Sequence, residues 1–251
     1  MNETIIYQKS FCKSKELLSL LESINSDCNQ NDGLYHHYFI DEDYHDFSNR
    51  PCCYLAKAGD SVVGFLCPYE IDAYNVEFCV FVLPAYRRQK IASQLFFHVV
   101  SDYGEHSYSA SLLPDNKLGK DFLERIGFTY GCCECSMALL KKNFKKVSPK
   151  MKLDVHKEED TIYVTGLVGE IEIGSFCFTV SNTTACIHDV EVKEELRRRG
   201  YGYEMVASAL QDIFEKYDTV ILHVTKENTP AFHLYEKLNF QVLEELHYYE
   251  L

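Results

Sequence analysis

Two stretches of the 251-residue chain repeat each other at an almost constant spacing, and this repeat limits the possible folds more than any other feature. The segment VFVLPAYRRQKIASQL (80–95) matches VEVKEELRRRGYGYEM (190–205) at an offset of 110 residues. Further on, NKLGKDFLERIGF (116–128) matches NTPAFHLYEKLNF (228–240) at an offset of 112. Two matches in the same order and at nearly the same offset predict two copies of one fold.

Both copies show the same order of elements, because apolar and β-branched runs predict strands and apolar residues at helical spacing predict helices. In the first copy we expect strands near 53–58, 61–69, 75–83, 107–112 and 130–140, and helices near 91–103 and 117–126, after an extra N-terminal helix in KSKELLSLLESIN. In the second copy we expect strands near 161–168, 170–180, 184–193, 219–225 and 240–249, and helices near 200–216 and 228–238.

The expected fold class is therefore α/β (α+β), with two tandem domains that are each a mixed, mostly antiparallel sheet flanked by helices. We place the first domain at residues 1–140 and the second at 151–251. The stretch KKNFKKVSPK (141–150) is polar, basic and contains a proline, which is typical of a short linker.

Charge and hydropathy exclude some classes of partner. The formal net charge of −13 argues against general nucleic-acid binding, which needs a basic face, and is compatible with a cationic or amine substrate. We find no apolar run long enough to span a bilayer, and the N-terminal residues lack the order of a secretion signal. We therefore expect a cytoplasmic protein with no nucleic-acid or membrane partner, while the oligomeric state stays open.

The chain has eleven cysteines, and in a cytoplasmic protein we expect them to be reduced. Cys132, Cys133 and Cys135 resemble half of a metal site, but no second Cys/His pair follows at zinc-ligand spacing. Adjacent residues on a strand also point to opposite faces. We favour packing over metal binding for this group and expect no metal.

A strand, a basic loop and a helix follow one another between Cys186 and Ala209. This order places a helix N-terminus beside Gly200 and Gly202, whose lack of a side chain lets backbone N–H groups approach an anion. Arg197, Arg198 and Arg199 add positive charge, so a pyrophosphate would fit. The alternatives are a solvated basic turn before an ordinary helix, or, less favoured on an acidic protein, a nucleic-acid patch.

At these residues the sequence resembles the GNAT superfamily of acyl-CoA N-acyltransferases. The pattern R-x-x-G-x-G follows a strand ending in V-x-V, and N-x-x-A-x-x-x-Y-E-K-x-x-F follows about 26 residues later. The resemblance covers essentially the whole second copy and, more weakly, the first. It implies that acetyl-CoA is the co-substrate, with pantetheine lying where the strand of Val190 and Val192 splays from the next strand. The implied cofactor-binding residues are Val190, Glu191, Val192, Arg197, Arg198, Arg199, Gly200, Tyr201, Gly202, Asn228, Ala231 and Tyr235.

The resemblance also implies direct attack of an amine on the thioester, which needs a base for the amine and an acid for the leaving thiolate. Tyr235 matches the family's acid, although a buried helix aromatic is the plainer interpretation of the same residue. For the base, His188, His223 and Glu191 stay open. His188 lies four residues before Val192 and is expected on the same strand face, whereas alternation suggests that Glu191 points away from His188.

The first copy lacks these groups in the same alignment, so we interpret it as a degenerate GNAT-like domain. Tyr235 corresponds to Leu123, His223 to Ser111, His188 to Phe78, Glu191 to Phe81, Gly200 to Lys90 and Gly202 to Ala92. The second copy in turn lacks the N-terminal helices that wall the acceptor pocket in the family, and we expect the first copy to supply that wall.

Two functions follow from the sequence. The first is an N-acetyltransferase that moves an acetyl or other short acyl group from CoA to a primary amine on a small molecule or peptide, such as a polyamine or an aminoglycoside. The second is a non-catalytic acyl-CoA-binding sensor or interaction module. Retention of Tyr235, Gly200, Gly202 and Asn228 together favours the enzyme.

Overall fold

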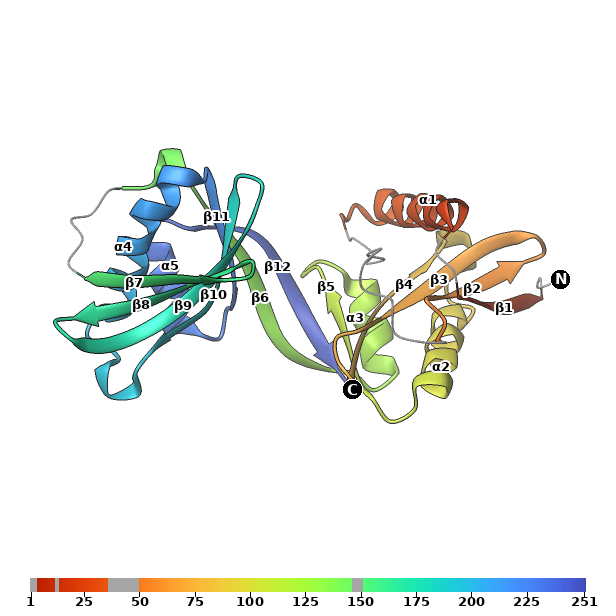
Figure 1. Ribbon diagram of the computed structural model, residues 1–251. Coiled ribbons are helices and arrows are strands. Elements are labelled where there is room, and N and C mark those ends of the chain that lie inside the picture. The colour runs from red at the N-terminus through yellow and green to blue at the C-terminus, as the bar shows by residue number, and fades with distance from the viewer. Residues whose placement is uncertain (1–3, 12–13, 36–49, 146–150) are drawn as a thin grey trace. The chain divides into compact units, whose positions relative to one another are not determined.

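The computed structural model describes residues 4–11, 14–35, 50–145 and 151–251 (Figure 1). The chain forms two compact units. The first unit consists of residues 1–131 together with 246–251, and the second consists of residues 132–245. Each unit contains one mixed, mostly antiparallel sheet flanked by helices, as the sequence predicts.

The first unit is a sheet with the strand order β1-β2-β3-β4-β5-β12, and of the strands that the structure describes there, only β4 and β5 are parallel neighbours. Its strands are β1 (Ile5–Ser10), β2 (Cys53–Ala58), β3 (Ser61–Glu70), β4 (Asn75–Val82), β5 (Ser107–Leu112) and the C-terminal part of β12 (Gln241–Glu250). Its helices are α1 (Lys15–Asp32), α2 (Ile91–Tyr103) and α3 (Lys117–Arg125), with a 3₁₀ turn η1 (Pro84–Tyr86) between β4 and α2.

The sheet of the first unit separates two cores, because alternate strand residues point to opposite faces. Phe65 and Phe81 stack at 5.3 Å and belong to the core with α1, while Leu66 and Phe78 belong to the core with α2 and α3. Helix α1 begins where the backbone N–H of Leu17 donates to the Ser14 hydroxyl, and it ends at Gly33 in the left-handed conformation. Helices therefore cover both faces of this sheet.

The second unit has the strand order β6-β11-β10-β9-β8-β7, and its parallel pair is β10 and β11. Its strands are β6 (Thr129–Leu140), β7 (Lys152–Glu158), β8 (Thr161–Val168), β9 (Ile171–Ser181), β10 (Thr184–Val192) and β11 (Thr219–Thr225). Its helices are α4 (Tyr201–Lys216) and α5 (Thr229–Lys237), with the 3₁₀ turns η2 (Lys141–Asn143) and η3 (Glu194–Leu196). Both helices pack on one face of the sheet, over a core that includes Met205, Leu210 and Phe214.

All the predicted strands and helices are present, and two additional strands, β1 and β7, were not predicted. The predicted domain limits need correction, because the last strand of each copy joins the other unit. Ser136 of β6 pairs with His223 of β11 in the second unit, and His247 of β12 pairs with Leu112 of β5 in the first. Periodicity identifies a strand but not its partner, and two similar sheets offer similar edges. Residues 146–150 of the expected linker lie outside the described residues. At its other end, the backbone N–H of Lys141 donates to the Asp218 carbonyl, so the start of the expected linker is part of the second unit.

Candidate functional site

The predicted anion loop of the second unit joins β10 to α4 through η3, and its two glycines have different roles. Gly200 has a φ of +84°, and no atom lies within 4 Å of the point that a Cβ would occupy, so the backbone conformation is what favours glycine there. A Cβ at Gly202 would lie 3.0 Å from Leu234 and 3.4 Å from Val192. Gly202 therefore lets α4 pack closely on α5 and β10, and only Gly200 shapes the loop.

The arginines of this loop also differ in what they contact. The Arg197 Nε donates to the Val192 carbonyl at 2.9 Å, and its guanidinium reaches the Glu191 carboxylate at 3.3 Å. Arg199 donates to the Glu195 carbonyl at 3.2 Å. Arg198 is exposed and has a φ of 64°. Arg197 and Arg199 thus brace the turn, and Arg198 presents its charge to solvent beside the start of α4, where Tyr201 is half-buried.

The first unit keeps the same loop backbone. The Arg87 Nε donates to the Val82 carbonyl at 2.9 Å, as Arg197 does to Val192. Arg88 and Lys90 have φ values of 62° and 63°. The lysine at the position of Gly200 therefore leaves the left-handed conformation in place, at a cost of roughly 1–2 kcal/mol for a residue with a side chain.

In each unit the two parallel strands separate after a short ladder, as the resemblance implied. The β10–β11 ladder ends at Ile187 opposite Leu222, and the β4–β5 ladder ends at Glu77 opposite Ser109. His188 and His223 are the next residues on the two separating strands of the second unit. The two histidines that the sequence singled out therefore stand on opposite sides of the same opening.

A β-bulge in β10 changes the expected orientation of the candidate bases. His188 pairs with Cys177 and Glu191 pairs with Ser175, with a register shift between them at Asp189, whose φ is 54°. Because residues 175 and 177 share one face of β9, His188 and Glu191 share that face too. The expectation that they point apart was wrong.

The same bulge places His188 and Val192 on opposite faces, which corrects the second expectation about this strand. Val192 pairs with Gly174, and it packs with Val190 against the helix-side core. On β11, the buried residues Val220, Leu222 and Val224 belong to that core, so His223 lies on the other face. All three candidate bases therefore lie on the sheet face away from α4 and α5.

Polar neighbours hold the two histidines. The Nε2 of His188 lies 3.1 Å from the Thr179 hydroxyl oxygen. The Nδ1 of His223 lies 3.0 Å from the Ser136 hydroxyl oxygen and 3.8 Å from a Glu134 carboxylate oxygen. The contacts of His223 could not be found in the sequence, since Ser136 and Glu134 come from β6, which the repeat assigns to the other copy.

The candidate acid, Tyr235, lies on the helix side of the sheet. It projects from α5 into the core, is 6% exposed and meets the Phe240 ring at 5.8 Å between centroids. Burial raises the pKa of the Tyr235 phenol to about 12, so it stays protonated at neutral pH, as a proton donor requires. At the start of α5, the backbone N–H of Ala231 donates to the Asn228 side chain at 3.4 Å, which confirms the predicted cap.

The bulge also corrects one residue of the alignment between the copies. Val82 and Phe81 pair with Gly64 and Phe65 in the first unit, as Val192 and Glu191 pair with Gly174 and Ser175 in the second. Beyond the bulge, His188 pairs with Cys177, and the residue that pairs with the equivalent Cys67 is Cys79. Cys79, and not Phe78, therefore stands at the position of His188.

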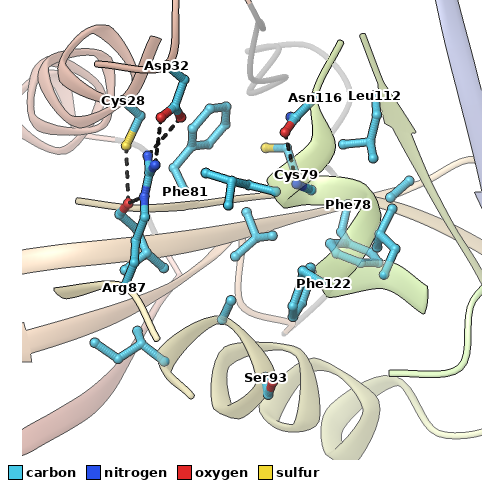
Figure 2. Close-up of a pocket in the computed structure, with 18 of the residues that line it drawn as sticks. Cys28, Asp32, Phe78, Cys79, Phe81, Arg87, Ser93, Leu112, Asn116 and Phe122 are labelled. Atoms are coloured by element: carbon cyan, nitrogen blue, oxygen red, sulfur yellow. Dashed lines mark hydrogen bonds and ion pairs between the residues drawn. The ribbon is translucent and has the colours of Figure 1, made fainter. Parts of the chain in front are cut away.

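The first unit contains a cavity of about 190 Å³ at its split strands (Figure 2). The cavity reaches from the loop at Arg88 and Lys90, past the separating ends of β4 and β5, to helix α1. At the α1 end, Arg87 holds Asp32 with two contacts of 2.6 and 2.8 Å, visible in Figure 2. The positions equivalent to the four candidate catalytic residues all line this cavity, and they carry Cys79, Phe81, Ser111 and Leu123.

The cysteine group from the sequence has a packing role in the second unit. Cys133 and Cys135 are buried in its core, and burial raises the pKa of the Cys133 thiol to about 12. Within the described ranges, no three His, Cys, Asp or Glu side chains gather as metal ligands. Helices long and apolar enough to cross a bilayer are also absent from this part of the chain.

Comparison with known proteins connects both copies to one superfamily. Residues 17–128 match the model of the acetyltransferase (GNAT) family, and residues 166–249 match the model of the FR47-like protein family. The first copy, in which the sequence motifs were weaker, thus has a match of its own.

Solved structures share the fold over nearly the whole chain. A GCN5-related N-acetyltransferase from Sphaerobacter thermophilus superposes with a TM-score of 0.74 at 11% identity, covering 98% of this chain and 95% of that one. A tandem GNAT protein from the clavulanic acid biosynthesis pathway superposes with a TM-score of 0.63 at 12% identity, covering 99% of this chain and 98% of that one. At these identities the likeness concerns the fold.

One curated relative matches a short stretch. The mycothiol acetyltransferase of Corynebacterium aurimucosum is 40% identical over 60 residues, which is 24% of this chain and only 20% of the relative's own length. Taken with the two family models and the tandem fold of the solved structures, the chain belongs to the GNAT superfamily of N-acetyltransferases, as two tandem copies of its fold.

Proposed function

We propose that the second unit transfers an acetyl or other short acyl group from acetyl-CoA to a primary amine by direct attack. The observation that carries this proposal is the opening between β10 and β11, which has His188 and His223 at its mouth. A phenol that stays protonated lies on the other side of the same sheet, on α5. Aminolysis of a thioester requires a base for the attacking amine and an acid for the departing thiolate, and in our proposal the opening in the sheet gives one thioester access to both.

The residues around the anion loop suit the co-substrate. Arg198 and Gly200 have left-handed conformations beside the N-terminus of α4, and such conformations are typical of loops whose backbone N–H groups bind an anion. In our proposal these amides hold the pyrophosphate, and Arg198 adds charge. The side of β10 from Val190 to Val192 that no longer pairs with β11 bonds to pantetheine, and Asn228 and Ala231 face it from the start of α5.

The reaction moves one proton at each end. The amine nitrogen attacks the thioester carbonyl, the C–S bond breaks, and the acyl group is left on nitrogen. One of the three candidate bases, His188, His223 or Glu191, takes the proton from the amine, directly or through water. Tyr235 gives its proton to the departing thiolate. No acyl-enzyme forms.

The surroundings of the histidines favour a cationic acceptor. Glu134 lies 3.8 Å from His223, Asp189 accepts from the Cys177 thiol at 3.7 Å, and the side chain of Glu191 is 74% exposed. Three carboxylates on or beside this face, one of which is paired with Arg197, attract an ammonium group, which loses its proton before attack. A small polyamine, an aminoglycoside or a peptide amine would all satisfy this chemistry.

The test uses the full chain. Calorimetry measures acetyl-CoA binding, and thiol release is followed over a panel of amines for wild type, His188→Gln, His223→Gln and Tyr235→Phe. His156→Gln is the matched control, because His156 is an exposed strand histidine of the same unit that stacks on Tyr163. We expect one histidine variant and Tyr235→Phe to lose at least tenfold in kcat, with the control unchanged. Equal activity in all four would refute the assignment.

A second candidate function is acyl-CoA binding without turnover. It is favoured by the cavity of the first unit, whose four equivalent positions carry neither a histidine nor a carboxylate. Binding without thiol release from any amine would select this function for the whole protein, and absence of binding would exclude both.

A further inference from the structure

We infer that Glu134, together with Ser136, positions His223 as the general base of the proposed reaction by keeping the ring hydrogen on Nδ1. The inference rests on the proposed function in one respect, namely that an amine loses its proton at the opening between β10 and β11. It chooses one of the three candidate bases, and it gives a role to two residues of β6, the strand that the repeat assigns to the first copy.

The pairing of β6 with β11 brings these side chains to the ring. Ser136 lies directly opposite His223 in the antiparallel register. Glu134 comes two residues earlier on β6, so its side chain projects from the same face and is a diagonal neighbour of the ring. The Nδ1 of His223 lies 3.0 Å from the Ser136 hydroxyl oxygen and 3.8 Å from a Glu134 carboxylate oxygen. Both polar neighbours therefore meet the same ring nitrogen.

The charge of Glu134 determines which ring nitrogen carries the hydrogen. A neutral imidazole has one N–H donor and one acceptor nitrogen, and its surroundings select between the two tautomers. The Ser136 hydroxyl can donate or accept, so it fits either form. The carboxylate is too far for a hydrogen bond at 3.8 Å, but its negative charge favours an N–H and disfavours a lone pair on Nδ1. Nε2 of His223 then carries the lone pair that a base needs.

The other two candidate bases are held differently. The Nε2 of His188, the ring nitrogen farther from the main chain, lies 3.1 Å from the Thr179 hydroxyl oxygen. Thr179 belongs to β9, the neighbour of β10 on the side away from β11. Glu191 is paired with Arg197 at 3.3 Å. Within the described residues, both polar contacts of the His223 ring are made by Nδ1, so its Nε2 is left for an acceptor amine.

The first unit provides an internal comparison. Ser111 of β5 stands at the position of His223, and its partner on β12 is Tyr248. Two residues before Tyr248 the strand has Leu246, at the position that Glu134 occupies in the second unit. The carboxylate therefore occurs in the copy that has a histidine to orient, and an apolar side chain stands in the copy that has a serine.

The tautomer of His223 is measured directly by nitrogen-15 NMR of the imidazole rings in the full chain, at alkaline pH where neutral rings predominate. The signals that disappear in His223→Gln identify this ring among the ten histidines. We expect the hydrogen on Nδ1 in the wild type and on Nε2 in Glu134→Gln, because glutamine removes the charge and its amide can donate to Nδ1. Glu134→Asp keeps the carboxylate and should keep the wild-type tautomer.

Thiol release over the amine panel connects the tautomer to catalysis. We expect kcat to fall at least about tenfold in Glu134→Gln and about 100-fold in His223→Gln, with acetyl-CoA affinity unchanged in calorimetry. Glu134→Asp should recover most of the wild-type kcat. Glu158→Gln is the matched control, because Glu158 lies 3.9 Å from His156 on the edge strand β7. The side chains of Glu134 and Glu158 are 36% and 70% exposed, so both variants are expected to fold, which a thermal melt checks.

Hydrogen on Nε2 of His223 in the wild type would overturn the positioning by Glu134. Wild-type kcat in Glu134→Gln would overturn its role in the reaction, and loss of kcat in His188→Gln but not in His223→Gln would overturn the choice of base. Failure of the proposed transfer reaction shows separately, as absent thiol release in the wild type, and the ring signals would still test the positioning.

Discussion

Replacing Tyr249 with alanine should destabilise the first unit, although residue 249 belongs to the second copy in the sequence. Tyr249 is 3% exposed and lies in the core of the first unit. It pairs with Ala110 of β5 and meets the Tyr130 ring edge-on at 5.8 Å. Truncating a buried aromatic side chain to alanine costs about 3–5 kcal/mol, a large share of the stability of a small unit.

Hydrogen exchange resolved by peptide is the appropriate assay, since it reports each unit separately. We expect faster exchange in α2 of the first unit, and unchanged exchange in α4 of the second. Leu243→Ala is the matched control, because Leu243 is in the same strand but is 68% exposed, and its loss should cost less than about 0.5 kcal/mol. Faster exchange in α4 with α2 unaffected would refute the strand exchange and support domain limits that follow the repeat.

Three further predictions concern single residues. Tyr235→Phe should lower kcat with little effect on acetyl-CoA affinity. In the wild type, kcat should show no loss from ionisation of the Tyr235 phenol below about pH 11, because burial raises the pKa of this phenol to about 12. A kcat–pH profile of both proteins checks these expectations. Lys90→Gly should be neutral or stabilising by up to about 1 kcal/mol, whereas Gly200→Ala should destabilise by about 1–2 kcal/mol, as measured by denaturant unfolding. Partial burial by itself raises the pKa of Asp32, but hydrogen bonds from Arg87 outweigh burial, and the pKa of Asp32 is lowered overall. The ion pair therefore stabilises the fold fully above the unfolded-state pKa of about 4, and this stabilisation is lost as the pH falls further. Asp32→Asn should remove that acid dependence in melts taken between pH 6 and pH 3, and an unchanged dependence would contradict the assignment.

Much of the candidate site could be predicted from the sequence. The glycine at 200, the arginines before it and the Asn228 cap depend on short-range backbone geometry, which neighbouring residues determine. The structure confirms the order of strand, loop and helix, the cap, and the separation of the parallel strands, while anion binding by the loop stays a prediction. The packing role of Gly202 was not predicted, because it depends on the approach of Leu234 from another helix.

The orientation of the bases could not be predicted, because it depends on one inserted residue. The bulge at Asp189 reverses the alternation of β10, so that His188 shares a face with Glu191 and not with Val192. A bulge is defined by the pairing of two strands, and β9 is the strand that reveals it. The correspondence of His188 with Cys79 became visible only through that pairing.

Periodicity and local backbone preference act over a few residues, and the amino-acid sequence alone was therefore enough to establish three features. These are the two copies of a split sheet, the approximate ends of nearly every strand and helix, and the loop that resembles an acyl-CoA site. Which strand completes which sheet emerged only from the folded chain, as β6 joins β11 and the end of β12 joins β5. The same holds for the cavity of the first unit, which persists without the catalytic groups. Both features depend on contacts between residues far apart in the chain. Many strand edges and sheet faces are chemically alike, so only the packing of the whole unit determines which of them meet.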